Sequence, residues 1–219
     1  MIRINNKSFR INRFLLAEVL AVLASGILKF TIMDWLGMRA FFIFGICLIW
    51  FIYILYRRHY DKDILREWGF TKDHFLPSIK RLFPVLIISV AASILYGTIR
   101  NEVTFSWHII PIFFLYPIWG VFQQYIMLGL FADNLTNFKR VNLGNFTLLI
   151  ITSLVFSLIH FPDYFLMIYV FGLEACFFIV WTRFKNIWAI GLVHGWIGTF
   201  LLFFISGRDL WAELFEWFR

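Results

Sequence analysis

The chain has 219 residues, of which 61% are hydrophobic and only 15% are charged, and its mean hydropathy is +0.79. About half of the residues of an ordinary soluble domain are apolar, so this composition excludes that class and indicates a protein with many membrane crossings. The formal net charge is +7, but the basic residues flank apolar runs, so we expect no nucleic-acid partner. We predict an all-α, polytopic transmembrane helix bundle in which residues 1–219 form a single transmembrane domain.

Seven apolar runs come close to the roughly 17–25 residues that a helix needs to cross a bilayer. They cover about 13–34, 40–56, 82–98, 107–132, 145–161, 164–182 and 187–206. Glu18 and Lys29 interrupt the first run, and we expect these two side chains to pair with other helices or to extend toward an interface. Because this run carries charge and has no small-residue cleavage site, we expect it to be an uncleaved first helix.

The basic residues predict the orientation of the bundle. With a cytoplasmic N-terminus and seven crossings, the opposite side has only Arg39, Arg100, Arg208 and Arg219 of the 20 basic residues. The positive-inside rule therefore favours a cytoplasmic N-terminus and a C-terminus on the opposite side. We expect a multi-pass integral protein of the bacterial plasma membrane, surrounded by membrane lipids.

Two polar segments contain enough apolar residues to lie on the membrane surface. The longest connection, residues 57–81, is partly amphipathic, and we expect it on the cytoplasmic face. Its two histidines, His59 and His74, are expected to be solvated. The C-terminal segment has its apolar residues on one helical face and is expected to form an interfacial helix on the outer side.

Isolated polar residues stand inside three of the late apolar runs. Gln123 and Gln124 are adjacent in WGVFQQYIMLGLF, His160 lies in SLVFSLIHFPD, and His194 lies in IWAIGLVHGWIGT. Lipid offers no partner for these groups, so each must meet protein groups or trapped water. We predict that the three stretches line one intramembrane site. The alternative is that the glutamines are ordinary interhelical hydrogen-bonding groups and that each histidine is a core residue.

Depth along the predicted helices supports most of this site. At about 1.5 Å per residue, Gln124 and His194 both lie roughly 12 Å from the cytoplasmic ends of their runs, whereas His160 lies roughly 24 Å deep. The depths agree only if the turn at Pro162 and Asp163 dips into the bundle. Irregular backbone is allowed at membrane depth where it is buried in protein or lines a cavity.

The order and spacing of these residues resemble the CAAX-protease and bacteriocin-processing family of intramembrane endopeptidases (CPBP, also called Abi). That family shows EExxxR in one helix, then FxxxH, then HxxxN. The present chain has Gln123-Gln124 followed by Leu128, then Phe156 to His160, then His194 to Gly198. The resemblance covers about residues 80–205. It implies that the first glutamate and the FxxxH histidine activate water, and that the third motif stabilises the oxyanion.

Four residues depart from the pattern of this family. Gln123 and Gln124 replace both glutamates, Leu128 replaces the arginine, and Gly198 replaces the asparagine. Glutamine cannot act as a general base, and the loss of a base typically costs 10²–10⁴-fold in rate. The loss of an oxyanion-hole donor costs a further 10²–10³-fold. The changes are mutually consistent, because removing the acids together with the arginine leaves no unpaired charge in the membrane.

Glu174 is the carboxylate that could restore the chemistry. It lies about 9 residues before Arg183, or roughly 14 Å deep, near the depth of Gln124 and His194. Our hypothesis is that Glu174 or His160 serves as the base and that Gln123, Gln124 and His194 donate hydrogen bonds. The alternative is that Glu174 is protonated or paired for structural reasons. We predict no cofactor. Zinc is the alternative, because two histidines could bind it, but the sequence shows no obvious third ligand.

Three functions are consistent with the sequence. The first is a CPBP-like intramembrane endopeptidase with altered or weakened chemistry that acts on a membrane-embedded or membrane-adjacent peptide. The second is a catalytically inactive family member that binds a membrane protein or peptide. The third is a small transporter or lipid-binding bundle, although the internal repeats typical of many transporters are not evident.

Overall fold

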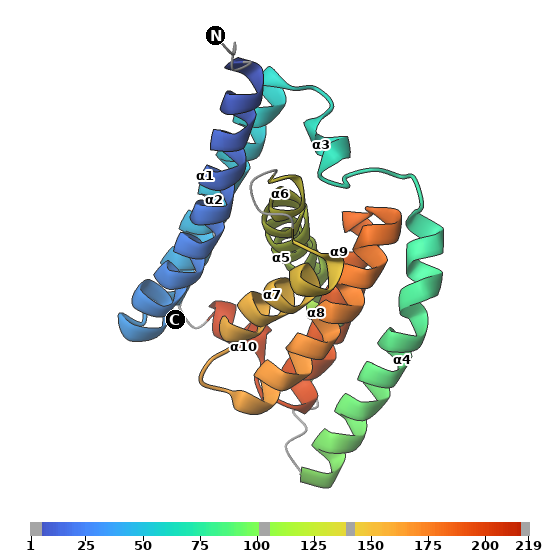
Figure 1. Ribbon diagram of the computed structural model, residues 1–219. Helices are drawn as coiled ribbons and strands as arrows, with labels where there is room; N and C mark the ends of the chain where they lie inside the picture. Colours follow the sequence, from blue (N-terminus) through green and yellow to red (C-terminus); the bar gives the residue numbers. More distant parts are fainter. Residues whose placement is uncertain (1–5, 101–105, 139–142, 216–219) are drawn as a thin grey trace. The chain divides into compact units, whose positions relative to one another are not determined.

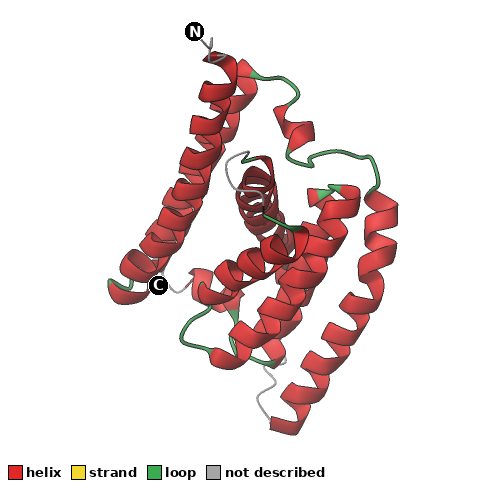
Figure 2. Cartoon of the chain, viewed as in Figure 1, coloured by secondary structure: helices red, strands yellow, loops and turns green. Residues whose placement is uncertain are grey.

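The computed structural model describes residues 6–100, 106–138 and 143–215, and all regular structure in these ranges is helical (Figures 1 and 2). In chain order the elements are α1 (Asn6–Leu28), the π-helical η1 (Lys29–Trp35), α2 (Arg39–Tyr60), α3 (Ile64–Glu67), α4 (Phe75–Arg100), α5 (Ile109–Gln124), the π-helical η2 (Tyr125–Ala132), α6 (Asp133–Asn137), α7 (Asn145–Leu158), α8 (Tyr164–Phe184), α9 (Ile187–Phe204) and α10 (Leu210–Phe215). The predicted all-α class is confirmed.

Six helical stretches in the described ranges are long and apolar enough to cross a membrane. They are Phe14–Trp35, Arg39–Tyr60, Phe75–Arg100, Ile109–Asn137, Tyr164–Phe184 and Ile187–Phe204. Each corresponds to a predicted crossing. The remaining predicted crossing, 145–161, is the 14-residue helix α7, which at about 1.5 Å per residue is shorter than the roughly 30 Å hydrocarbon core. The chain is therefore a multi-pass bundle, and its orientation stays a prediction.

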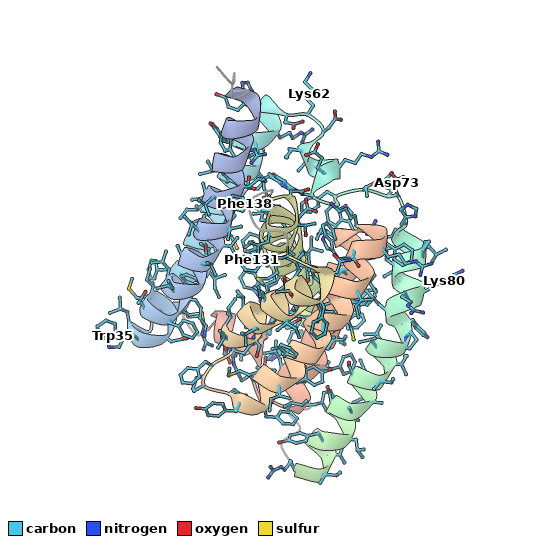
Figure 3. The ribbon with its side chains drawn as sticks, in the orientation of Figure 1. Trp35, Lys62, Asp73, Lys80, Phe131 and Phe138 are labelled. Carbon is cyan, nitrogen blue, oxygen red and sulfur yellow. The ribbon has the colours of Figure 1, made fainter. Side chains whose placement is uncertain are left out.

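The internal contacts divide the chain into two units. The first contains Met1–Gly69 and Ile126–Phe178, and the second contains Phe70–Tyr125 and Ile179–Arg219. In the first unit, α1 continues into η1, and α2 returns alongside them. Trp35 and Lys62 lie at opposite ends of this hairpin (Figure 3).

A buried carboxylate joins three helices of the first unit. Glu18 on α1 is 4% exposed and accepts hydrogen bonds from Tyr53 and Arg57 on α2. Its second oxygen lies 2.5 Å from Nδ2 of Asn134 on α6. Arg57 also lies over the ring of Trp68. Pairing offsets the large cost of placing this charge among apolar helices, so Glu18 pairs with another helix, as expected from the sequence.

The second unit is organised around α9, which packs against α5 and α4. The face of α4 that is buried is mainly small, with Ser89, Ser93 and Gly97 among its residues. A Cβ atom at Gly97 would lie 2.3 Å from the carbonyl oxygen of Phe204, so the two backbones nearly touch. Small residues allow this close approach between membrane helices.

Polar pairs lie where α9 ends and α5 begins. Nδ1 of His108 lies 2.6 Å from Oδ2 of Asp209, and Arg208 donates two hydrogen bonds to Glu213 at 2.9 and 2.6 Å. Burial by itself would raise the pKa of Asp209, but the backbone N–H of Ala212 and the ring of His108 lower that pKa overall. Asp209 is therefore ionised at neutral pH.

Two surface segments differ in part from their predicted form. Within 57–81, residues from Phe75 onward belong to α4, while Ile64 and Trp68 are buried. The predicted C-terminal helix is α10, and its Leu210 and Trp211 pack against a core cluster of α5 and α9 residues. Residues 216–219, which include part of that predicted helix, lie outside the described ranges.

We predict that Glu18→Ala lowers the free energy of unfolding by about 3 kcal/mol, because it leaves the Arg57 guanidinium without its buried partner. Thermal and denaturant unfolding in detergent micelles measures this loss. The matched control is Asp34→Ala, which removes the more exposed Lys29–Asp34 pair (15% and 37% exposed) and should cost less than about 1 kcal/mol. Equal losses for the two variants would contradict the assignment of Glu18 as a buried anchor.

Candidate functional site

The contact between α5 and α9 is lined with glycine, and this brings the polar residues of the two helices within reach. A Cβ atom at Gly191 would lie 2.3 Å from the Cα of Val121, and one at Gly195 would lie 2.2 Å from the Cα of Pro117. A Cβ at Gly120 would lie 2.4 Å from the carbonyl oxygen of Gly191. Only glycine permits these distances, so the two backbones are in direct contact.

Gln124 and His194 meet in this contact. Nε2 of Gln124 lies 2.9 Å from Nδ1 of His194, and the two side chains are 0% and 7% exposed. Gln124 is the last residue of α5, and the chain continues directly into the π-helical η2. Such π-helical segments are frequent at functional sites.

Gln123 lies beside this pair in the sequence and is only partly buried. Its Oε1 atom is buried, and among the described residues this oxygen has no hydrogen-bond partner. Buried polar atoms nearly always have a partner in folded proteins. A buried acceptor without a protein partner is expected where a ligand or a water molecule binds.

Asn186 fixes the start of α9 and therefore the position of His194 two turns further along. Its side-chain oxygen accepts the backbone N–H of Ala189 at 2.9 Å, which makes it the N-cap of the helix. Its Nδ2 donates to the carbonyl oxygens of Thr71 and Asp73, both at 2.8 Å. An asparagine directly before an apolar run is a capping signal that is visible in the sequence.

His160 lies in the first unit, in the turn between α7 and α8. Its Nδ1 is 3.0 Å from the carbonyl oxygen of Phe156, and the two rings pack edge to face with centroids 5.2 Å apart. The FxxxH spacing thus places the phenylalanine one helical turn before the histidine, where its ring and its carbonyl both hold the imidazole.

Glu174 is fully buried in α8, in the first unit. The structure therefore brings Gln124 and His194 together, with Gln123 adjacent, in one unit. It places His160 and Glu174 in the other unit. A shared site for all five residues stays a prediction, as does the absence of a cofactor.

Tyr116 is a residue that the sequence analysis did not select. It lies two turns before Gln124 on the same face of α5, and its ring covers Gly198, where a Cβ atom would be 2.4 Å from Cε1 of Tyr116. A larger residue at 198 would have to displace the tyrosine ring. Nothing in the one-dimensional pattern links positions 116 and 198, because the contact depends on the crossing of the two helices.

The comparison with known families matches residues 70–200 to the type II CAAX prenyl endopeptidase Rce1-like family. The match covers more than half of the chain and includes Gln123, Gln124, His160, Glu174 and His194. The chain belongs to this family, which confirms the CPBP resemblance. The searches of curated proteins and of solved structures found no match.

We predict that Gly195→Ala separates α5 from α9, because its new methyl group would meet the backbone of Pro117. We expect the free energy of unfolding to fall by about 1–3 kcal/mol, as for other overpacked contacts. Unfolding in detergent micelles measures this loss. Gly172→Ala on α8 is the matched control, since a Cβ there meets no atom within 4 Å. That variant should be neutral or slightly more stable because alanine favours helix. Unchanged stability of Gly195→Ala would show that the two helices are not in backbone contact.

Proposed function

We propose that the chain is an intramembrane endopeptidase of the CAAX type with altered catalytic chemistry, and that it hydrolyses a membrane-embedded or membrane-adjacent peptide. The observation that carries this proposal is the buried Gln124–His194 hydrogen bond. It lies between two apolar helices of the family-matched range, at the positions where the family motifs have a glutamate and a histidine. An apolar helix contact retains such groups at a cost, and polar groups at membrane depth commonly mark a functional site.

The proposed reaction is the attack of water on a peptide carbonyl. The base that takes the proton from water is His160 or Glu174, because glutamine has no basic group at neutral pH. Gln123, Gln124 and His194 donate hydrogen bonds to the carbonyl oxygen, on which negative charge develops in the transition state. The proton then passes from the base to the leaving amine. We place this chemistry in the bacterial plasma membrane.

A slow enzyme is expected from this arrangement. A missing general base costs 10²–10⁴-fold in rate, so His160 or Glu174 must act as the base in place of the motif glutamates. The replacement of both motif glutamates by Gln123 and Gln124 also supports a second candidate, a family member that binds a membrane peptide without cleaving it. An amide and an imidazole can hold a carbonyl group of a peptide without activating water.

The test is peptide cleavage by the full-length protein reconstituted in liposomes. The substrates are a peptide with a prenylated C-terminal CAAX sequence, chosen because of the family, and an apolar helical peptide. We expect slow cleavage, a loss of at least about 10²-fold in His160→Ala, and normal cleavage in His59→Ala, which changes a histidine that is not part of the predicted site. Glu174→Gln distinguishes the two candidate bases, since full activity in this variant would exclude Glu174.

The single substitution Gln123→Glu separates the two candidate functions. If the fold retains a site for water activation, restoring the first carboxylate of the family motif should raise the cleavage rate by 10-fold or more. Peptide binding without cleavage, in both the natural chain and this variant, would contradict the endopeptidase and favour the binding protein.

A further inference from the structure

The partner of each buried histidine determines which ring nitrogen carries the proton. An amide nitrogen can only donate a hydrogen bond, whereas a carbonyl oxygen can only accept one. A neutral imidazole has one nitrogen that donates and one that accepts, and the bond made by one nitrogen therefore fixes the character of the other.

His194 faces a donor. Nε2 of Gln124 lies 2.9 Å from Nδ1 of His194, so in this geometry the amide N–H donates and Nδ1 accepts. The proton of the neutral ring is then on Nε2. His194 consequently presents an N–H group from Nε2 and has no basic nitrogen there.

His160 faces an acceptor. Its Nδ1 lies 3.0 Å from the carbonyl oxygen of Phe156, so Nδ1 carries the proton and donates it to the backbone. Nε2 of the neutral ring then has a lone pair. His160 consequently presents a basic nitrogen, which is the opposite of what His194 presents.

We propose that Gln124 and the Phe156 carbonyl hold the two histidines in opposite tautomers, with His160 as a proton acceptor and His194 as a hydrogen-bond donor at Nε2. This inference rests on the proposed function and extends it, because it favours His160 over Glu174 as the base. It also makes Gln124 a positioning residue whose role a glutamate could not fill. A carboxylate at 124 would accept a hydrogen bond from Nδ1 and would move the ring proton away from Nε2 or add a second proton.

The test is nitrogen-15 NMR of the full-length protein with labelled histidine, in lipid bilayers at about pH 8, above the usual histidine pKa of about 6.5. No substrate is needed, so the outcome is independent of whether the protein cleaves a peptide. Protonated and unprotonated ring nitrogens give separate resonances. The signals of the two rings are assigned from their loss in His194→Phe and His160→Phe.

We expect a protonated Nε2 in His194 and a protonated Nδ1 in His160. In Gln124→Glu the Nδ1 of His194 should become protonated, while His160 should be unchanged and so provides the internal control. Gln124→Met, which keeps the side-chain length without the amide, should abolish the preference of His194 for one tautomer. A protonated Nδ1 of His194 in the natural chain, or a His194 spectrum that is the same in Gln124→Glu, would overturn the proposal.

Discussion

The hydrogen bond between Gln124 and His194 is the interaction on which the account of this protein depends. Helices that lie in lipid have no water to satisfy a side-chain amide or an imidazole, so each must find a partner within the protein. The pair can form only because glycines at 120, 191 and 195 bring the backbones of α5 and α9 into contact. The same interaction thus joins the packing of the fold to the chemistry of the family motifs.

The protein treats buried charge differently in its two units. In the first unit the carboxylate of Glu18 is paired with Arg57 and also accepts hydrogen bonds from Tyr53 and Asn134. At the α5–α9 contact the buried polar groups are instead an amide and an imidazole, whose nitrogens lie within hydrogen-bond distance of each other. An amide and an imidazole cost less to bury than a carboxylate, and under our proposal they provide hydrogen-bond donors while the base comes from another element.

The sequence predicted the helical class and the family. It also predicted the six helical stretches of the described ranges that are long enough to cross a membrane. These follow from apolar length and from motif order, both of which are visible along one dimension. The predicted run started at about residue 82, because the charged Lys80 and Arg81 are typical of a loop. The helix α4 begins earlier, at Phe75. The sequence prediction also treated 145–161 as a full crossing, since Ile159 and Phe161 continue the apolar run although α7 ends at Leu158.

The candidate site could be predicted only in part. Gln124 and His194 were selectable because polar residues are rare in such runs, and their meeting is consistent with their similar depths. Tyr116 could not be selected, because its role comes from the absence of a side chain at Gly198 across the helix contact. The short contacts of Asn186 with Thr71 and Asp73 join residues more than 110 positions apart, and no local pattern indicates them.

A double-mutant cycle on Gln124 and His194 tests the central claim most directly. The free energy of unfolding in micelles is compared for the natural chain, Gln124→Leu, His194→Phe and the double variant. A direct hydrogen bond between membrane helices predicts a coupling energy of about 0.5–2 kcal/mol. A coupling energy indistinguishable from zero would mean that the two side chains do not meet, and would contradict the account.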